Sequence, residues 1–259
     1  IQALDQRKTG RCSITAMKNI GIICEGPTDY IILKNVINLI TGDTNYFVLL
    51  QPEPDLRGQY GNGWKGVWKW CHDYASIRMQ LMDKIQPTLD FLVIQMDGDV
   101  SRKEKVSHCG CGSVKCPLQN IRNPLECDIK PEYRNNCPVL LPCPEHNAPV
   151  SSYMEHLKSL IRSWLKEIDR TCIAIPCDST EAWIAAAYDN LPEIEFMENP
   201  WENVIAKKKI YHGIRISGKN KRARIFEQFA PVVCKNRDRV TELCLSAREF
   251  ERDISLLGR

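Results

Sequence analysis

Short apolar runs alternate with segments whose apolar residues recur at helical spacing. Four runs predict buried strands, at residues 18–24, 47–50, 90–96 and 172–176. The segments between and after them predict helices over residues 28–41, 64–85, 151–165 and 180–188. Because strands and helices alternate in this way, we expect an α/β fold with a parallel, helix-covered sheet.

The same pattern divides the chain of 259 residues into four parts. Residues 1–17 are polar and read as an N-terminal lead-in. Residues 18–99 and 151–190 make up the predicted α/β domain, which residues 100–150 interrupt as a Cys-rich insertion without clear periodicity. Residues 191–259 form a basic region that we expect to be mainly helical.

Composition fits a soluble globular protein, with 43% hydrophobic and 26% charged residues. No apolar run approaches the roughly 20 residues that cross a bilayer, and residues 1–8 lack the apolar core of a signal peptide. We therefore expect a cytoplasmic protein without a membrane partner. The net charge of +3 is too small to indicate nucleic acid by itself. Basic residues cluster at 207–209 and 219–224, where they would either contact phosphates or form a solvated face.

Carboxylates and glycine follow two of the predicted strands directly. Glu25 and Gly26 come after the first strand, and Asp97, Gly98 and Asp99 come after the third. Either group alone would read as a simple turn. Since the carboxyl ends of neighbouring parallel strands converge, these acids should meet at one sheet edge, where their mutual repulsion favours a bound hard cation. The pair predicts a site for Mg²⁺ or Mn²⁺.

Glu25-Gly26 with Asp29, followed by Asp97-Gly98-Asp99, resembles the toprim fold of primases, topoisomerases, recombination-mediator proteins and some nucleases. The resemblance covers about residues 18–190, apart from the insertion. It implies that Glu25 acts in acid–base or metal chemistry and that Asp97 and Asp99 hold magnesium.

The segment that begins at Ile175 contains Asp178 and Glu181-Ala-Trp183, which resembles stand-alone relatives of the overcoming-lysogenisation-defect (OLD) nucleases. That resemblance implies a second metal, with Glu181 as candidate ligand and Asp178 as a weaker one. Alternatively, residues 178–180 cap a helix and Glu181 is a first-turn acid. Two metals would suit in-line attack of water on a phosphodiester, and a lysine would offset the developing charge. Lys209 is our candidate among several lysines.

Six of the thirteen cysteines lie between residues 109 and 143. Their spacing is irregular, so a disulfide-stapled loop and packed reduced thiols are alternatives to structural zinc. We favour zinc, because so polar a loop needs a staple. The candidate ligands are Cys109, Cys111, Cys116, Cys127, Cys137, Cys143 and His146.

These features together predict a Mg²⁺-dependent nuclease or nickase, with DNA favoured over RNA and a role in anti-phage defence implied by the resemblance alone. Residues 213–219 lack the Ser or Thr and the preceding strand of a phosphate-binding loop, so an ATPase would be a separate partner protein. The alternative is a non-catalytic toprim-like module that binds nucleic acid or protein and is organised by zinc.

Overall fold

A four-stranded parallel sheet forms the centre of the computed structural model. The structure describes residues 17–52, 61–102, 141, 143–145, 147–166, 168–197, 199–207, 212–216 and 221–258. The strands are β1 (Asn19–Ile23), β2 (Tyr46–Gln51), β3 (Phe91–Gln95) and β4 (Thr171–Ala174), in the order β2-β1-β3-β4. All three strand pairs are parallel. The predicted α/β fold with a parallel, helix-covered sheet is therefore confirmed.

The connections reverse direction at the centre of the sheet. Helix α1 (Pro27–Thr41) leads from β1 outward to β2, whereas α2 (Trp64–Tyr74) and α3 (Arg78–Lys84) lead back past β1 to β3. Helix α4 (Val150–Leu165) precedes β4 on the far side. Because β1 and β3 are neighbours whose chains depart in opposite directions, the crevice where ligands bind in open α/β sheets is expected beyond their carboxyl ends.

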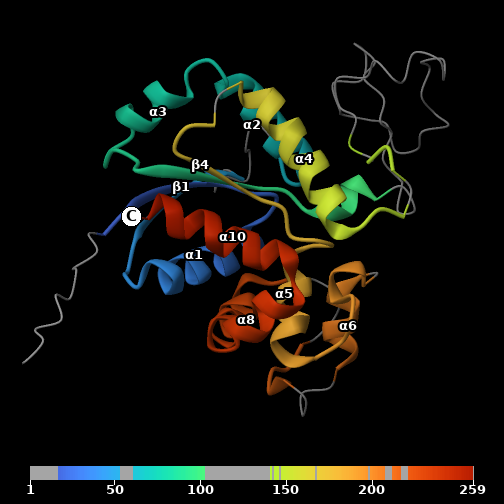
Figure 1. The fold of residues 1–259 in the computed structure, drawn as a ribbon. Coiled ribbons are helices and arrows are strands. Elements are labelled where there is room, and N and C mark those ends of the chain that lie inside the picture. The colour runs from blue at the N-terminus through green and yellow to red at the C-terminus, as the bar shows by residue number, and fades with distance from the viewer. Residues whose placement is uncertain are drawn as a thin grey trace, which may run out of the picture.

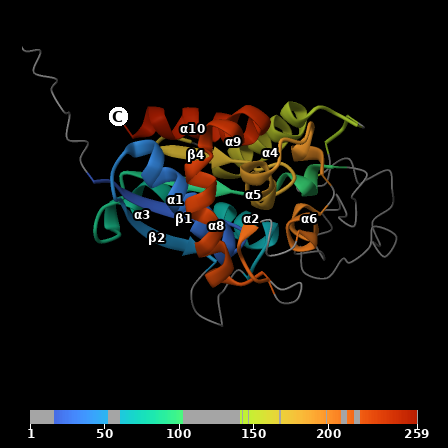
Figure 2. The ribbon, with the colours of Figure 1, turned by 90° about the horizontal axis from the view of Figure 1, so that it is seen from below.

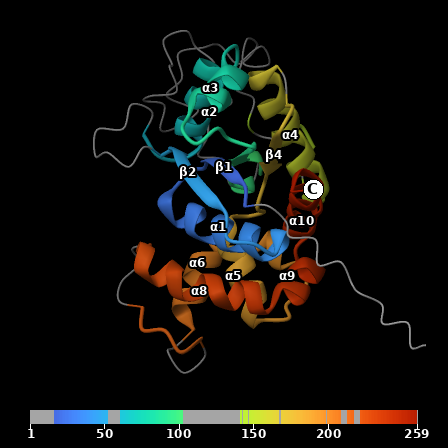
Figure 3. The ribbon, with the colours of Figure 1, turned by 90° about the vertical axis from the view of Figure 1, so that its left-hand side faces the viewer.

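Alternating side chains of the strands divide the core between the two faces of the sheet. Ile20 and Ile22 of β1 join one apolar cluster, and Ile23 joins the other. Figures 1 and 3 show the resulting layers, with α2, α3 and α4 on one face. The opposite face is covered by α1, α5 (Thr180–Tyr188), α8 (Ala223–Lys235) and α9 (Arg237–Leu243), seen from below in Figure 2.

The C-terminal region is helical, as predicted, and its helices share the core of the sheet. The 3-10 turn η5 (Ile194–Phe196) and helix α6 (Pro200–Ala206) precede α8, and α10 (Leu245–Leu257) ends the described chain. Phe226, Phe229 and Phe250 belong to the same apolar cluster as Ile20. Helix α10 contacts β4, α1 and α4, so it closes one side of the sheet.

The strand bounds differ by one or two residues from the sequence-based expectation, and three helices differ in how they begin or continue. Helix α1 begins at Pro27 after Gly26, because proline presets the first helical turn, and Thr28 does not cap it. Helix α4 begins at Val150 without a side-chain cap. The helix expected over 64–85 is split into α2 and α3. The break turns Arg78 inward, where its Nη1 donates to the Asp169 carbonyl at 2.7 Å.

Most of the Cys-rich insertion and the lead-in lie outside the described residues. Beyond β3 the described chain continues through the 3-10 turn η1 (Gly98–Ser101) to Arg102, and the next described residue is Leu141. Among the helices described, none is long and apolar enough to span a bilayer.

Candidate functional site

Glu25 and Asp97 meet at the crevice beyond β1 and β3. The Glu25 Oε1 atom accepts a hydrogen bond from the Asp97 backbone N–H at 2.9 Å. The Glu25 carbonyl in turn accepts one from the N–H of Gly63, at the start of α2, at 2.8 Å. The expectation that parallel strands would bring these acids together is confirmed.

Gln95 holds both acidic turns from inside the sheet. Its side chain is fully buried at the end of β3. Its Oε1 accepts the Glu25 backbone N–H at 3.0 Å, and its Nε2 donates to Asp97 Oδ1 at 2.8 Å. A buried amide with both ends used in this way fixes the separation of the two turns.

Backbone hydrogen bonds extend the pairing of β3 with β4 beyond both strands. The N–H of Gly98 donates to the Pro176 carbonyl at 2.8 Å, and the N–H of Asp99 donates to the Asp178 carbonyl at 3.0 Å. The two chains approach so closely at Gly98 that a Cβ there would lie 2.3 Å from Cys177 Sγ. Any larger residue at position 98 would force the two chains apart, and the ladder places Asp97 and Asp99 beside the loop that leads into α5.

Asp29 and Glu181 add carboxylates from the first turns of α1 and α5. Thr180 Oγ1 donates to Asp29 Oδ1 at 2.5 Å, which ties the two helix starts together. Glu181 is completely buried, and its Oε1 lies 2.5 Å from Lys221 Nζ. Apart from this ion pair, neither Glu181 oxygen accepts a hydrogen bond within the described part of the chain.

Burial, together with repulsion between these carboxylates, favours their protonated forms. Burial, and then the Asp99 carboxylate, raise the pKa of Glu25 to about 8. Burial and Glu181 raise the pKa of Asp29 to about 6. Burial, Asp29 and Glu25 raise the pKa of Asp97 well above its ordinary value. Part of each rise comes from a neighbouring carboxylate, so these acids lie close enough to repel one another.

Lys221 is the positively charged residue that the structure shows beside these carboxylates. Burial lowers the pKa of Lys221, but the Glu181 carboxylate outweighs that effect, so the pKa is raised and the ammonium stays charged. The lysine side chain is 43% exposed and borders a cleft of about 290 Å³. The acids that line this cleft are Asp97, Asp99, Asp178, Glu181 and Glu202.

The donor chemistry fits a hard divalent cation, although the described residues alone do not form a finished ligand set. Within the described residues, no three Asp, Glu, His or Cys side chains stand in an arrangement that could hold a metal ion. The buried Glu181 oxygens nevertheless lack hydrogen-bond donors, and the surrounding carboxylates raise one another's pKa. Oxygen donors with excess negative charge match the preference of Mg²⁺.

The remaining predicted site residues are engaged in other contacts or lie outside the described residues. Asp178 borders the cleft, but its Oδ1 faces Arg102 Nη1 at 3.4 Å. Cys143 is a free, buried thiol in the apolar cluster beneath α4. The rest fall outside the described residues: Lys209, Cys109, Cys111, Cys116, Cys127, Cys137 and His146.

Sequence reasoning did not assign site roles to Gln95, Asp29 and Lys221. Gln95 left a signal, because it is the polar residue in an otherwise apolar strand. Asp29 belongs to the residues that carry the toprim resemblance, but the resemblance does not place it among the candidate ligands. Lys221 lies in a basic cluster, and nothing in its spacing distinguishes it from neighbouring lysines.

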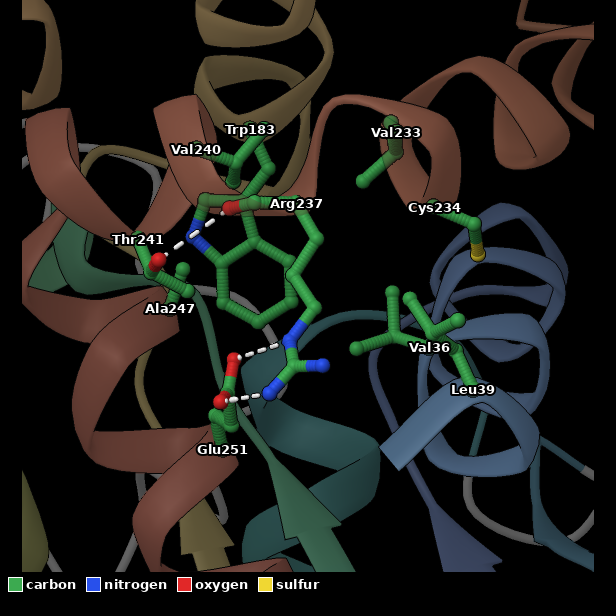
Figure 4. Close-up of a pocket in the computed structure, with 10 residues that line it drawn as sticks. All are labelled: Val36, Leu39, Trp183, Val233, Cys234, Arg237, Val240, Thr241, Ala247 and Glu251. Atoms are coloured by element: carbon green, nitrogen blue, oxygen red, sulfur yellow. Dashed lines mark hydrogen bonds and ion pairs between the residues drawn. The ribbon is translucent and has the colours of Figure 1, made fainter. Parts of the chain in front are cut away.

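A second hollow, drawn in Figure 4, lies between α1, α5, α8, α9 and α10, and it shares no lining residue with the acidic cleft. It measures about 20 Å³ and is lined mainly by apolar side chains such as Val36 and Val240. Its charged groups satisfy each other, since Arg237 Nε donates to Glu251 Oε2 at 2.7 Å. The volume suits about one water molecule, so this hollow is a packing gap and not a ligand site.

The acidic crevice is therefore the candidate functional site. Comparisons with protein-family models, with curated proteins and with solved structures give no match to this chain.

Proposed function

We propose that this protein is a metal-dependent nuclease of the toprim type, related to stand-alone OLD nucleases. The observation that carries the proposal is the convergence of Glu25, Asp29, Asp97 and Glu181, whose charges act on one another at the carboxyl ends of parallel strands. Perturbed carboxylates in a cleft are typical of sites that act on protons or metals.

Each residue has a role in this proposal. Asp97, Asp99 and Glu25 would hold Mg²⁺ or Mn²⁺, and Glu181 would contribute to a second ion. Bound metal would supply Lewis-acid stabilisation of phosphate oxygens and an activated water. Lys221 keeps its charge at the rim of the cleft, which suits it to offset negative charge that develops on a phosphodiester.

Nucleic acid is the proposed substrate, with DNA favoured over RNA. Arg222 and Arg224 are exposed beside Lys221 at the start of α8, which supports contacts to a phosphate backbone next to the acidic cleft. A separate ATPase partner and a role in anti-phage defence remain part of the proposal through the resemblance.

Structural zinc in the Cys-rich insertion is proposed on sequence grounds. Cys143, the described cysteine of this group, is packed among apolar side chains, which supports a packing role for that thiol. Elemental analysis of protein purified under reducing conditions tests the proposal, and the absence of zinc would contradict it.

Cleavage assays test the nuclease proposal. We expect Mg²⁺- or Mn²⁺-dependent cutting of DNA that is lost in Asp97→Asn and in Glu25→Gln, with folding retained. Asp73→Asn is the matched control, because Asp73 is an exposed carboxylate on α2. Cutting that survives both site substitutions, or that needs no metal, would overturn the proposal.

A non-catalytic binding module is the second candidate. It is favoured by the lack of a finished metal-ligand set among the described residues and by Lys221 pairing with Glu181. This function predicts nucleic-acid or protein binding that is insensitive to metal, to Asp97→Asn and to Glu25→Gln.

A further inference from the structure

Asp99 is held on both sides by two residues whose side chains pair with each other. Its backbone N–H donates to the Asp178 carbonyl at 3.0 Å, and its carbonyl accepts the Arg102 N–H at 3.1 Å. Arg102 Nη1 then lies 3.4 Å from Asp178 Oδ1. Asp99, Arg102 and Asp178 thus form a closed ring of contacts, called here the Asp99 clamp.

The clamp is buried although it is built from charged groups. The Arg102 and Asp178 side chains are 7% and 6% exposed. The Arg102 guanidinium also donates to the Phe196 carbonyl at 3.2 Å and lies 5.5 Å from the Phe196 ring centroid. Because a buried ion pair gains little stability over an apolar pair of similar volume, its presence beside the acidic cleft calls for another explanation.

We propose that Arg102 and Asp178 are positioning residues, which fix the Asp99 backbone so that its carboxylate is directed to the proposed metal site. The inference rests on the proposed function, because that function supplies the metal. The contacts of the Asp99 clamp are present in the structure whether or not a metal binds. It assigns Asp178 a role through Arg102 and Asp99 in place of direct metal ligation. Outer residues that orient a metal ligand typically change metal affinity 10–100-fold when they are replaced.

Metal binding and amide exchange test the clamp together. Binding of Mn²⁺ is followed by electron paramagnetic resonance, and exchange of the Asp99 amide by NMR. The variants are Arg102→Met, Asp178→Asn and the double variant, with Arg162→Met as control because Arg162 pairs with Glu155 on the surface. Thermal unfolding is recorded for each.

We expect Arg102→Met and Asp178→Asn to weaken Mn²⁺ binding by about 10–100-fold each. The double variant should bind no more weakly than either single one, because both changes open the same ring. Exchange of the Asp99 amide should quicken at least about tenfold in all three variants by loss of the same local structure. Arg102→Lys should recover part of both losses, and Arg162→Met should change neither.

Two results would overturn the inference. If Asp178 is itself a ligand, Asp178→Asn loses Mn²⁺ while Arg102→Met binds it as well or better, since a competing cation has gone. Unchanged exchange of the Asp99 amide in folded Arg102→Met would equally refute the clamp. Absence of Mn²⁺ binding in the unaltered protein would instead count against the proposed function, and the exchange data would still decide the clamp. Should Arg102→Met fail to fold, Arg102→Lys and the nearly isosteric Asp178→Asn give the same comparison.

Discussion

Glu25 Oε1 accepts a hydrogen bond from the Asp97 backbone N–H at 2.9 Å, which joins two turns that lie 72 positions apart in the chain. The bond is possible because β1 and β3 are parallel neighbours, with Ile23 paired with Ile94. Both acidic turns therefore leave the sheet at the same edge. The geometry of the site depends on this pairing of strands more than on any local motif.

Replacing Gln95 with methionine should loosen both acidic turns. The Glu25 N–H would lose its acceptor and Asp97 its donor in a fully buried place, while side-chain volume is nearly kept. Unfolding in urea should show a loss of about 1–3 kcal/mol in the free energy of unfolding. Gln80→Met is the control, since Gln80 is exposed on α3. Equal stability of the two variants would show that the Gln95 contacts contribute nothing.

Replacing Lys221 with methionine should leave Glu181 as a buried, unpaired carboxylate. Removing one partner of a fully buried ion pair lowers the free energy of unfolding by about 3–5 kcal/mol. Because the Lys221 side chain is 43% exposed, we expect a smaller loss of about 1–2 kcal/mol. Lys207→Met is the control, because Lys207 forms a partly exposed pair with Asp189 at 3.2 Å. Adding Glu181→Gln to Lys221→Met should restore stability. A double variant as unstable as Lys221→Met would contradict this account of the pair.

The acidic edge could be predicted because its signals are local. Each strand is a short apolar run, and Glu25, Asp97 and Asp99 follow their strands directly. Parallel order then brings them together without knowledge of side-chain packing. The existence of the elements follows from the same periodicity, whereas the break between α2 and α3 accompanies a long-range contact of Arg78 with the chain before β4, which periodicity does not show.

Contacts between distant segments could not be predicted in this way. Lys221 reaches Glu181 only because α8 packs beside α5, and no pattern in either helix specifies that packing. The sequence alone therefore does not distinguish Lys221 from Lys209, which lies outside the described residues. In the sequence, Asp178 fits either a helix-capping acid or a metal ligand. Its pairing with Arg102 depends on how the chain turns after β3, which the sequence pattern does not show.

Replacing Gly98 with alanine should disturb the site through packing. The added Cβ would lie 2.3 Å from Cys177 Sγ and 3.1 Å from the Pro176 carbonyl oxygen, so the loops after β3 and β4 must separate. We expect a loss of about 1–3 kcal/mol in stability and a shift of Asp97 and Asp99. Adding Cys177→Ala should recover part of the loss, because the sulfur is the nearest atom. If the double variant is no more stable than Gly98→Ala, the sulfur contact is not the cause.

The raised pKa of Glu195 predicts a pH dependence of stability away from the candidate functional site. Its Oε2 accepts the Leu245 N–H at 2.6 Å and its Oε1 the Ser246 N–H at 3.1 Å, at the start of α10. Burial raises the pKa of Glu195 from 4.5 to about 7. Between these values the folded state binds more protons than the unfolded state, so this group's contribution to stability falls as pH rises through that range. The fall should be at most about 3 kcal/mol.

Glu195→Gln isolates this effect because the amide does not titrate. The difference in unfolding free energy between the unaltered protein and Glu195→Gln should decline from pH 5 to pH 7 and then level off. Urea unfolding at each pH measures it, with Glu227→Gln as control because Glu227 is exposed on α8. A difference that rises with pH would mean that the backbone donors of α10 outweigh burial and hold the pKa of Glu195 below its ordinary value. In that case the hydrogen-bond donors at the start of α10, and not desolvation, control the pKa of Glu195.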